Sequence, residues 1–141
     1  MKTLSTIAAL AILAAVPASA ATPEGLWHTA DNNGEVLISA CDQGALCGKI
    51  VTSDRIKAQP GLADDKNKDA SLRTRLLKDL PILKGFTGGP VEWKGGSVYR
   101  PEDGNTYKGT IKVIDANSIK LTGCVVFPLC KSQVWTRIKQ P

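Results

Sequence analysis

Apolar and polar residues alternate along the last third of the chain with the period of two that indicates β-strands. In residues 106–114, tyrosine, glycine, isoleucine and valine occupy one face, and threonines and lysines occupy the other. Residues 118–124 repeat the pattern, with Ile119 and Leu121 on the inner face. The final segment, 132–138, carries bulky side chains on both faces, which is expected of a strand that closes a barrel.

Five more strands are predicted upstream. Residues 25–29 form the first, residues 35–41 and 46–52 form a hairpin, and residues 91–94 and 97–100 form another around the turn Gly95-Gly96. This makes roughly eight strands at the short spacing of an all-β barrel or sandwich. Counting 81–86 as a ninth would make the first and last strands parallel in a meander, so we assign it to the long connection 53–89.

An even count predicts a roughly eight-stranded antiparallel up-and-down barrel in which the first and last strands pair. Trp27 and Arg137 then lie at the same end, and Arg137 is expected to lie across Trp27 or Trp135 in a cation–π contact worth roughly 0.5–2 kcal/mol. The hairpin turn at 42–45 lies at that end, and the long connection lies at the other as a lid. The expected closure residues are Gly25, Trp27, Trp135 and Arg137.

The long connection carries two weaker signals. Leu72, Leu76 and Leu80 share helical spacing, which predicts a short helix. The stretch 65–69 matches the first three ligand positions of an EF-hand calcium loop, but alanine follows where that loop needs glycine, and Leu76 stands at the position of its bidentate glutamate. We therefore favour a hydrated loop in which Asp69 or Ser71 caps the helix.

The first 20 residues have the pattern of a secretory signal peptide. Lys2 precedes an apolar run over residues 4–16, and Ala18-Ser19-Ala20 is a cleavage signal. The run is too short for a transmembrane anchor. We expect a single domain over residues 21–141, located in the periplasm, with secretion as the alternative and no stable membrane anchor.

Four cysteines remain in the exported chain, which favours disulfides over metal ligands. Cys41 and Cys47 face each other across the hairpin turn at one end of the predicted barrel, whereas Cys124 and Cys130 flank a turn at the other. The expected pairing is therefore local, each bond stabilising the fold by about 2–3 kcal/mol. Neither pair has C-x-x-C spacing and His28 is the only histidine, so we expect no metal and no cofactor.

The charge of the chain gives little indication of a partner. Its formal net charge of +5 becomes +4 without Lys2, and the basic residues are mixed with acidic ones. This distribution argues against a nucleic-acid groove. His28 has no nearby nucleophile motif, so we predict that the protein is not an enzyme.

Inward-facing side chains provide the candidate ligand site. They either line a cavity or fill a solid core, and an eight-stranded barrel has room for either. Gly109 and Gly123 fall among the inward positions and favour space inside. The candidate lining residues are Trp93, Tyr99, Tyr107, Ile111, Ile119 and Leu121.

Several short motifs together resemble the DUF2147 family of small exported bacterial proteins. They are Gly-x-Trp at 25–27, the cysteine hairpin ending in Cys-Gly-Lys-Ile-Val at 47–51, an Asp/Asn-rich stretch leading into Leu72-Arg73-x-Arg75, Gly-Gly-x-Val-Tyr-x-Pro-x-Asp-Gly at 95–104 and Trp-Thr-Arg at 135–137. Leu76 stands where family members often have proline. The resemblance implies a lipocalin-like (calycin-like) barrel whose base is closed by the Gly-x-Trp motif and Arg137, and it supplies no catalytic residue.

The sequence thus favours a periplasmic lipocalin-like binding protein for a small apolar or amphipathic ligand. The alternative is a protein–protein module, such as a hydrolase inhibitor or an envelope-stress factor, with the charged loop 64–69 as the contact surface. An enzyme is the third and least favoured hypothesis.

Overall fold

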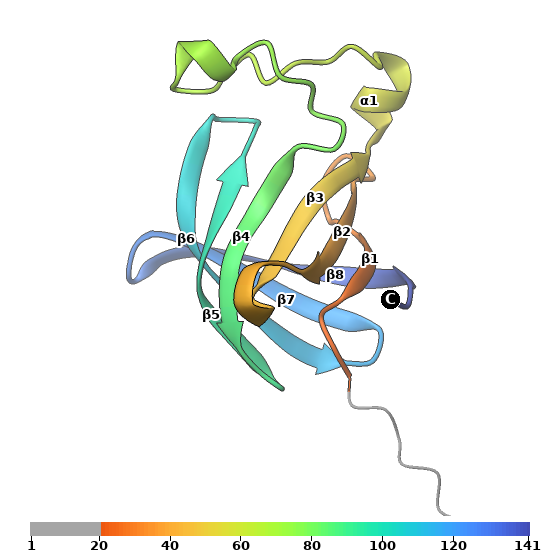
Figure 1. Cartoon of the computed structure of the whole chain (residues 1–141), viewed down its shortest axis with the longest axis vertical. Coiled ribbons are helices and arrows are strands. Elements are labelled where there is room, and N and C mark those ends of the chain that lie inside the picture. Colours follow the sequence, from red (N-terminus) through yellow and green to blue (C-terminus); the bar gives the residue numbers. More distant parts are fainter. Residues whose placement is uncertain (1–20) are drawn as a thin grey trace, which may run out of the picture.

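A computed structural model describes residues 21–141, in which eight antiparallel strands close into a barrel in sequence order (Figure 1). The expected signal peptide, residues 1–20, lies outside the described residues. The helices are short: α1 (Asp54–Ala58) and two 3-10 turns, Asp42–Gly44 and Ala70–Leu72. None of them is long and apolar enough to cross a membrane. The strands are β1 (Gly25–His28), β2 (Glu35–Ala40), β3 (Leu46–Thr52), β4 (Pro81–Gly88), β5 (Glu92–Arg100), β6 (Asn105–Asp115), β7 (Ser118–Val126) and β8 (Leu129–Lys139).

The two ends of the chain meet as neighbouring strands. β1 pairs antiparallel with β8, and Trp27 lies directly opposite Arg137. We call the end where β1 begins and β8 finishes the base, and the opposite end the mouth. Residues 53–80, called the lid below, lie across the mouth (Figure 1). The predicted eight-stranded antiparallel barrel is therefore confirmed.

Two strand assignments were wrong. One omitted a strand and the other divided one strand into two, so the predicted total of eight is still correct. Residues 81–86 are not part of the connection but belong to β4, which pairs with β5 through Leu83 and Val98. Gly95-Gly96 is not a hairpin turn, because β5 runs through it with a register shift between Trp93 and Gly96. Gly95 has a φ of +72°, which suits a tight turn and a bulge equally well.

The predicted local disulfides, Cys41–Cys47 at the base and Cys124–Cys130 at the mouth, are confirmed. Cys124 and Cys130 are direct cross-strand partners. Cys47, in contrast, pairs with Ser39, so the expected opposition of Cys41 and Cys47 is wrong by two residues. Cys41 lies just past the end of β2, and its Cα is still 5.8 Å from that of Cys47.

The helix predicted from Leu72, Leu76 and Leu80 is also wrong. Within residues 70–80, only the 3-10 turn Ala70–Leu72 is helical. Leu76 instead forms an isolated antiparallel bridge with Ala63. The predicted cap is present on the shorter turn, because the Asp69 side chain accepts a hydrogen bond from the Ser71 amide at 2.9 Å. Pairing across the lid has replaced the helix that the leucine spacing indicated.

The base half of the barrel is filled by side chains. Phe86 is fully buried, and its ring lies against Gly96 and Gly109 so closely that a Cβ at either glycine would overlap it. The space that Gly109 leaves is therefore occupied by Phe86 and not by a cavity. The other large, fully buried apolar side chains on the strands are Trp27, Ile38, Leu83, Ile111 and Ile119.

Candidate functional site

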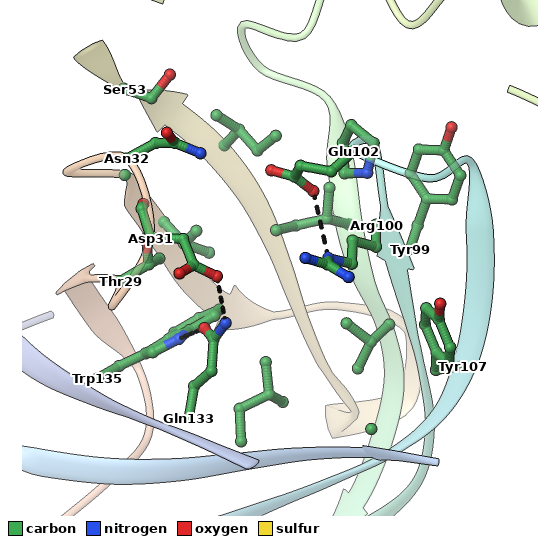
Figure 2. Close-up of a pocket in the computed structure, with 18 of the residues that line it drawn as sticks. Thr29, Asp31, Asn32, Ser53, Tyr99, Arg100, Glu102, Tyr107, Gln133 and Trp135 are labelled. Carbon is green, nitrogen blue, oxygen red and sulfur yellow. Dashed lines mark hydrogen bonds and ion pairs between the residues drawn. The ribbon is translucent and has the colours of Figure 1, made fainter. Parts of the chain in front are cut away.

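A cavity of about 700 Å³ occupies the mouth half of the barrel (Figure 2). Its walls come from the strands and its roof from the lid. The roof is apolar: Ile56 on α1, Leu62 and Leu77 all contribute to it. The apolar side chains of the wall and floor include Val36, Ile50, Ile82, Val98, Leu121 and Trp135.

Gly123 leaves the barrel wall open to the cavity, although it lies directly opposite Gly109 on the neighbouring strand. It lines the cavity, and a Cβ built there would lie 3.4 Å from the nearest atom, the Tyr107 Cβ, which is an ordinary contact distance. No large side chain has filled the space above it, in contrast to Phe86 above Gly109. The expectation that these two glycines leave room inside is therefore right for Gly123 and wrong for Gly109.

Polar side chains form a rim around the apolar interior. Gln133 donates a hydrogen bond to Asp31 at 2.6 Å, and the Trp135 indole N–H donates to Gln133 at 3.0 Å. On the opposite side, the Arg100 guanidinium lies 3.7 Å from the Glu102 carboxylate, as Figure 2 shows. The charged cavity-lining residues are three acidic, Asp31, Glu35 and Glu102, and three basic, Arg55, Arg100 and Lys131.

The lid is held to β5 by a buried carboxylate. Asp64 is only 1% exposed. Tyr99 donates to one of its oxygens at 2.5 Å, and Asn67 and Arg75 donate to the other at 2.8 and 2.9 Å. Gly104, in the β5–β6 turn, packs against the Lys66 backbone with no room for a Cβ. We call Asp64, Asn67, Arg75 and Tyr99 the latch.

The latch shifts the ionisation of its members. Burial alone would raise the pKa of Asp64, but hydrogen bonds from Tyr99, Arg75 and Asn67 and the charge of Arg75 lower it below the ordinary value of 3.8. Burial, together with the bond to Asp64, raises the pKa of Tyr99 to about 12. The latch therefore combines an ionised carboxylate with a protonated phenol over a wide range of pH.

The candidate lining residues divide between the two halves. Tyr99, Tyr107 and Leu121 line the cavity. Ile111 and Ile119 are fully buried in the core below it, and Trp93 packs over Gly89 in the β4–β5 turn at the base. Alternation placed these side chains on the inner face, but it could not say at which height along the barrel the packing stops.

The closure residues separate in a similar way. The Arg137 guanidinium lies 4.2 Å from the centre of the Trp27 ring and donates to the backbone carbonyls of Thr22, Glu24 and Ala116. Gly25 is required beneath it, since its φ is +129° and a Cβ there would lie 2.5 Å from the guanidinium. Trp135 lies on the cavity side instead, where it forms part of the floor.

Sequence reasoning missed the latch. Asp64 was assigned to a solvated charge run, and Asn67 to a partial calcium motif, yet both are buried. The available signal was that Arg75 and Tyr99 lie in two of the motifs shared with the family. Within residues 21–141, no group of three or more histidine, cysteine, aspartate or glutamate side chains is placed to hold a metal ion.

The barrel, closed at its base and hollow at its mouth, defines a lipocalin-like protein. One solved structure with this fold is described as "Protein HP1028 from the human pathogen Helicobacter pylori belongs to the lipocalin family". It has a TM-score of 0.74 and 19% sequence identity, and the alignment covers 84% of each chain.

The chain belongs to the family described as "Uncharacterized protein conserved in bacteria (DUF2147)", whose sequence model matches residues 25–137. This confirms the resemblance seen in the short motifs. A search of curated proteins gave no match.

Proposed function

We propose that this protein is a periplasmic binding protein that holds one small apolar or amphipathic molecule in the mouth-half cavity. The observation that supports this function is the cavity itself. Its volume of about 700 Å³ lies in the range of roughly 300–1,000 Å³ that is usual for small-molecule sites. Its apolar wall suits a hydrocarbon portion, and its charged rim suits a polar group.

A periplasmic location is supported by the leader sequence and by the two disulfides, since structural disulfides persist in oxidising compartments. Export would place the barrel in a compartment in which apolar molecules have to cross water between membranes. A cavity that shields such a molecule from water allows the protein to carry it without any chemical step.

Binding without catalysis fits the polar groups of the cavity. The polar side chains of the rim are paired with one another: Asp31 with Gln133, and Arg100 with Glu102. The single histidine of the chain, His28, lies outside the cavity lining. The buried carboxylate of Asp64 is committed to the latch, where three donors already occupy its oxygens.

A titration of residues 21–141 with a fluorescent long-chain fatty acid tests this proposal. Gly123→Leu should abolish or strongly weaken binding, because the new side chain grows from the wall into open space without a backbone clash. Gly61→Leu is the matched control, since Gly61 lies on the lid surface and a Cβ added to it would have no other atom within 4 Å. Equal affinities for the two variants and the unmodified chain would contradict binding in this cavity.

A further inference from the structure

The tip of the β7–β8 hairpin exposes a continuous run of apolar side chains. Val125, Val126, Phe127 and Leu129 are 66%, 68%, 85% and 70% exposed. The hairpin projects beyond the barrel wall, with its turn at the left of Figure 1 (blue). A run of large, strongly exposed apolar residues is unusual on a soluble surface and typically marks an interaction site.

This tip, residues 125–129, is a fixed feature of the fold. The Cys124–Cys130 disulfide joins the two strands directly before and after the tip. The Cys130 amide donates a hydrogen bond to the Pro128 carbonyl at 2.9 Å. Because the disulfide already restrains the turn, the chain loses little further conformational entropy when the tip is buried outside water. The tip is also part of the cavity wall, since Val125 and Leu129 line the cavity while being exposed.

Basic residues lie beside the tip on β8 and on the neighbouring strand β6. Residues 116–141 contain four lysines and arginines and no aspartate or glutamate. Lys131 follows the disulfide directly, and Lys108 pairs with Cys124 on the neighbouring strand, about 10 Å from Phe127 at the usual rise per residue. Further from the tip, Lys112 and Lys120 are direct cross-strand partners.

These lysines form no ion pair within the part of the chain that the structure describes; they are Lys108, Lys112, Lys120 and Lys131. Like charges directly opposite each other on adjacent strands destabilise a sheet. Lys112 has this arrangement with Lys120 on one side, but it lies opposite Glu92 on the other, so the argument for docking uses only Lys108 and Lys131.

We propose that the β7–β8 hairpin docks the protein on an anionic lipid bilayer, with the tip in the interface and Lys108 and Lys131 against the headgroups. An apolar group that enters the interface beside basic residues has the two components of peripheral membrane binding. The cavity wall then continues into the bilayer surface, which gives a lipid-phase molecule an apolar path to the cavity. Docking itself requires no ligand in the cavity, so the docking proposal is tested independently of the proposed function.

Vesicle co-sedimentation of residues 21–141, the range that contains the whole barrel, tests the docking. We expect the protein to sediment with vesicles of phosphatidylcholine mixed with phosphatidylglycerol and to bind phosphatidylcholine vesicles much more weakly. Phe127→Ser should lower the partition coefficient about tenfold or more, because it removes the largest inserted side chain. Its exposure leaves folding unaffected, which circular dichroism would verify.

Two matched pairs separate the tip from the rest of the surface. Val126→Ser should weaken binding, and Val91→Ser should not, because Val91 is 55% exposed in the β4–β5 turn at the base. Lys108→Gln should weaken binding to the anionic vesicles roughly fivefold. Lys84→Gln, which removes an exposed charge from β4, should leave it unchanged.

A reporter locates the insertion directly. In Phe127→Trp, the emission of the added indole should shift to the blue when anionic vesicles are added, while Val91→Trp shows no such shift. The proposal is overturned if the protein stays in the supernatant with both kinds of vesicle, or if Val126→Ser and Val91→Ser bind alike. It is also overturned if Phe127→Ser dissociates a dimer in solution, because the tip would then cover a second copy of the chain.

Discussion

The two halves of the barrel are built from the same eight strands but differ in what occupies their interior. In the base half, Phe86 lies across Gly96 and Gly109, and Arg137 covers Trp27. In the mouth half, Gly123 faces open space and the interior is a cavity. Strand pairing alone therefore does not decide whether such a barrel is solid or hollow. The difference comes from Phe86, which fills the space over Gly96 on β5 and Gly109 on β6 but does not reach Gly123, the direct partner of Gly109 on β7.

The two halves also differ in how they are held shut. The base is closed by a strand pair and a guanidinium that satisfies three backbone carbonyls. The mouth is closed by a loop that the latch ties to β5, and backbone hydrogen bonds of Asp79 and Leu80 with Ile50 tie it to β3. Local opening starts where few apolar contacts and few backbone hydrogen bonds must be broken. We therefore expect the base to set global stability and the latch to set access to the cavity.

The largest expected effect comes from emptying the base. Phe86→Ala should lower the free energy of unfolding by about 3–5 kcal/mol, because it removes a buried ring and leaves a void over two glycines. Phe127→Ala makes the same change at a side chain that is 85% exposed and should stay within about 0.5 kcal/mol. Urea denaturation measures both. Similar losses in the two variants would mean that the base is not the stable half.

Removing the base cover should have the next largest effect. Arg137→Ala deletes the contact with Trp27 and leaves three carbonyls without their donor, and we expect a loss of about 2–3 kcal/mol. The control is Lys57→Ala, because Lys57 is an exposed residue of α1 that does not line the cavity. Ligand affinity should be unchanged in Arg137→Ala, since the contact lies at the opposite end from the cavity. A loss of affinity without a loss of stability would contradict the division into two halves.

Weakening the latch should affect opening more than unfolding. Tyr99→Phe removes a donor from the buried Asp64 and should lower the free energy of lid opening by about 1–2 kcal/mol. Hydrogen exchange should report this at lid amides such as that of Leu77, which donates to the Leu62 carbonyl, and not at amides of the base. Tyr107→Phe loses a similar bond to Asp103 within the β5–β6 turn and should leave the lid unchanged.

The latch should also respond to pH. The pKa of Asp64 is lowered in the folded protein, so its contribution to stability is complete well above 3.8 and is lost as the pH falls through the folded pKa. The pKa of Tyr99 is raised to about 12, so its contribution is complete below 10 and is lost as the pH rises through about 12. Lid amides should lose protection in acid before base amides do. In Asp64→Asn the acid dependence of the lid should disappear, and an unchanged acid profile would show that another group controls it.

The sequence allowed the barrel, its closure and its disulfide pairing to be predicted, because alternation and cysteine spacing are local signals and the two strand errors left the strand count even. The error over 81–86 and Gly95-Gly96 has a physical cause. Glycine with positive φ serves a turn or a bulge equally well, and only the ring of Phe86, packed from the adjacent strand, shows which one is present. The residues next to Gly95 and Gly96 in the sequence do not reveal that cross-strand contact.

The cavity and the latch were harder to predict for the same reason. Gly109 and Gly123 look alike in the alternating pattern, yet one is covered by a side chain from β4 and the other is not. Asp64 and Tyr99 are 35 residues apart, and their bond depends on where the lid crosses the mouth. Contacts of this kind are properties of the assembled fold.

The division between a solid base and a hollow mouth is tested most directly by methyl NMR of residues 21–141 during a titration with dodecanoate. The account predicts shifts at the cavity methyls of Ile50, Ile56, Leu62, Leu77 and Leu121, with Ile38, Ile111 and Ile119 unchanged. Shifts centred on the base methyls, or no saturable shift at any cavity methyl, would contradict it.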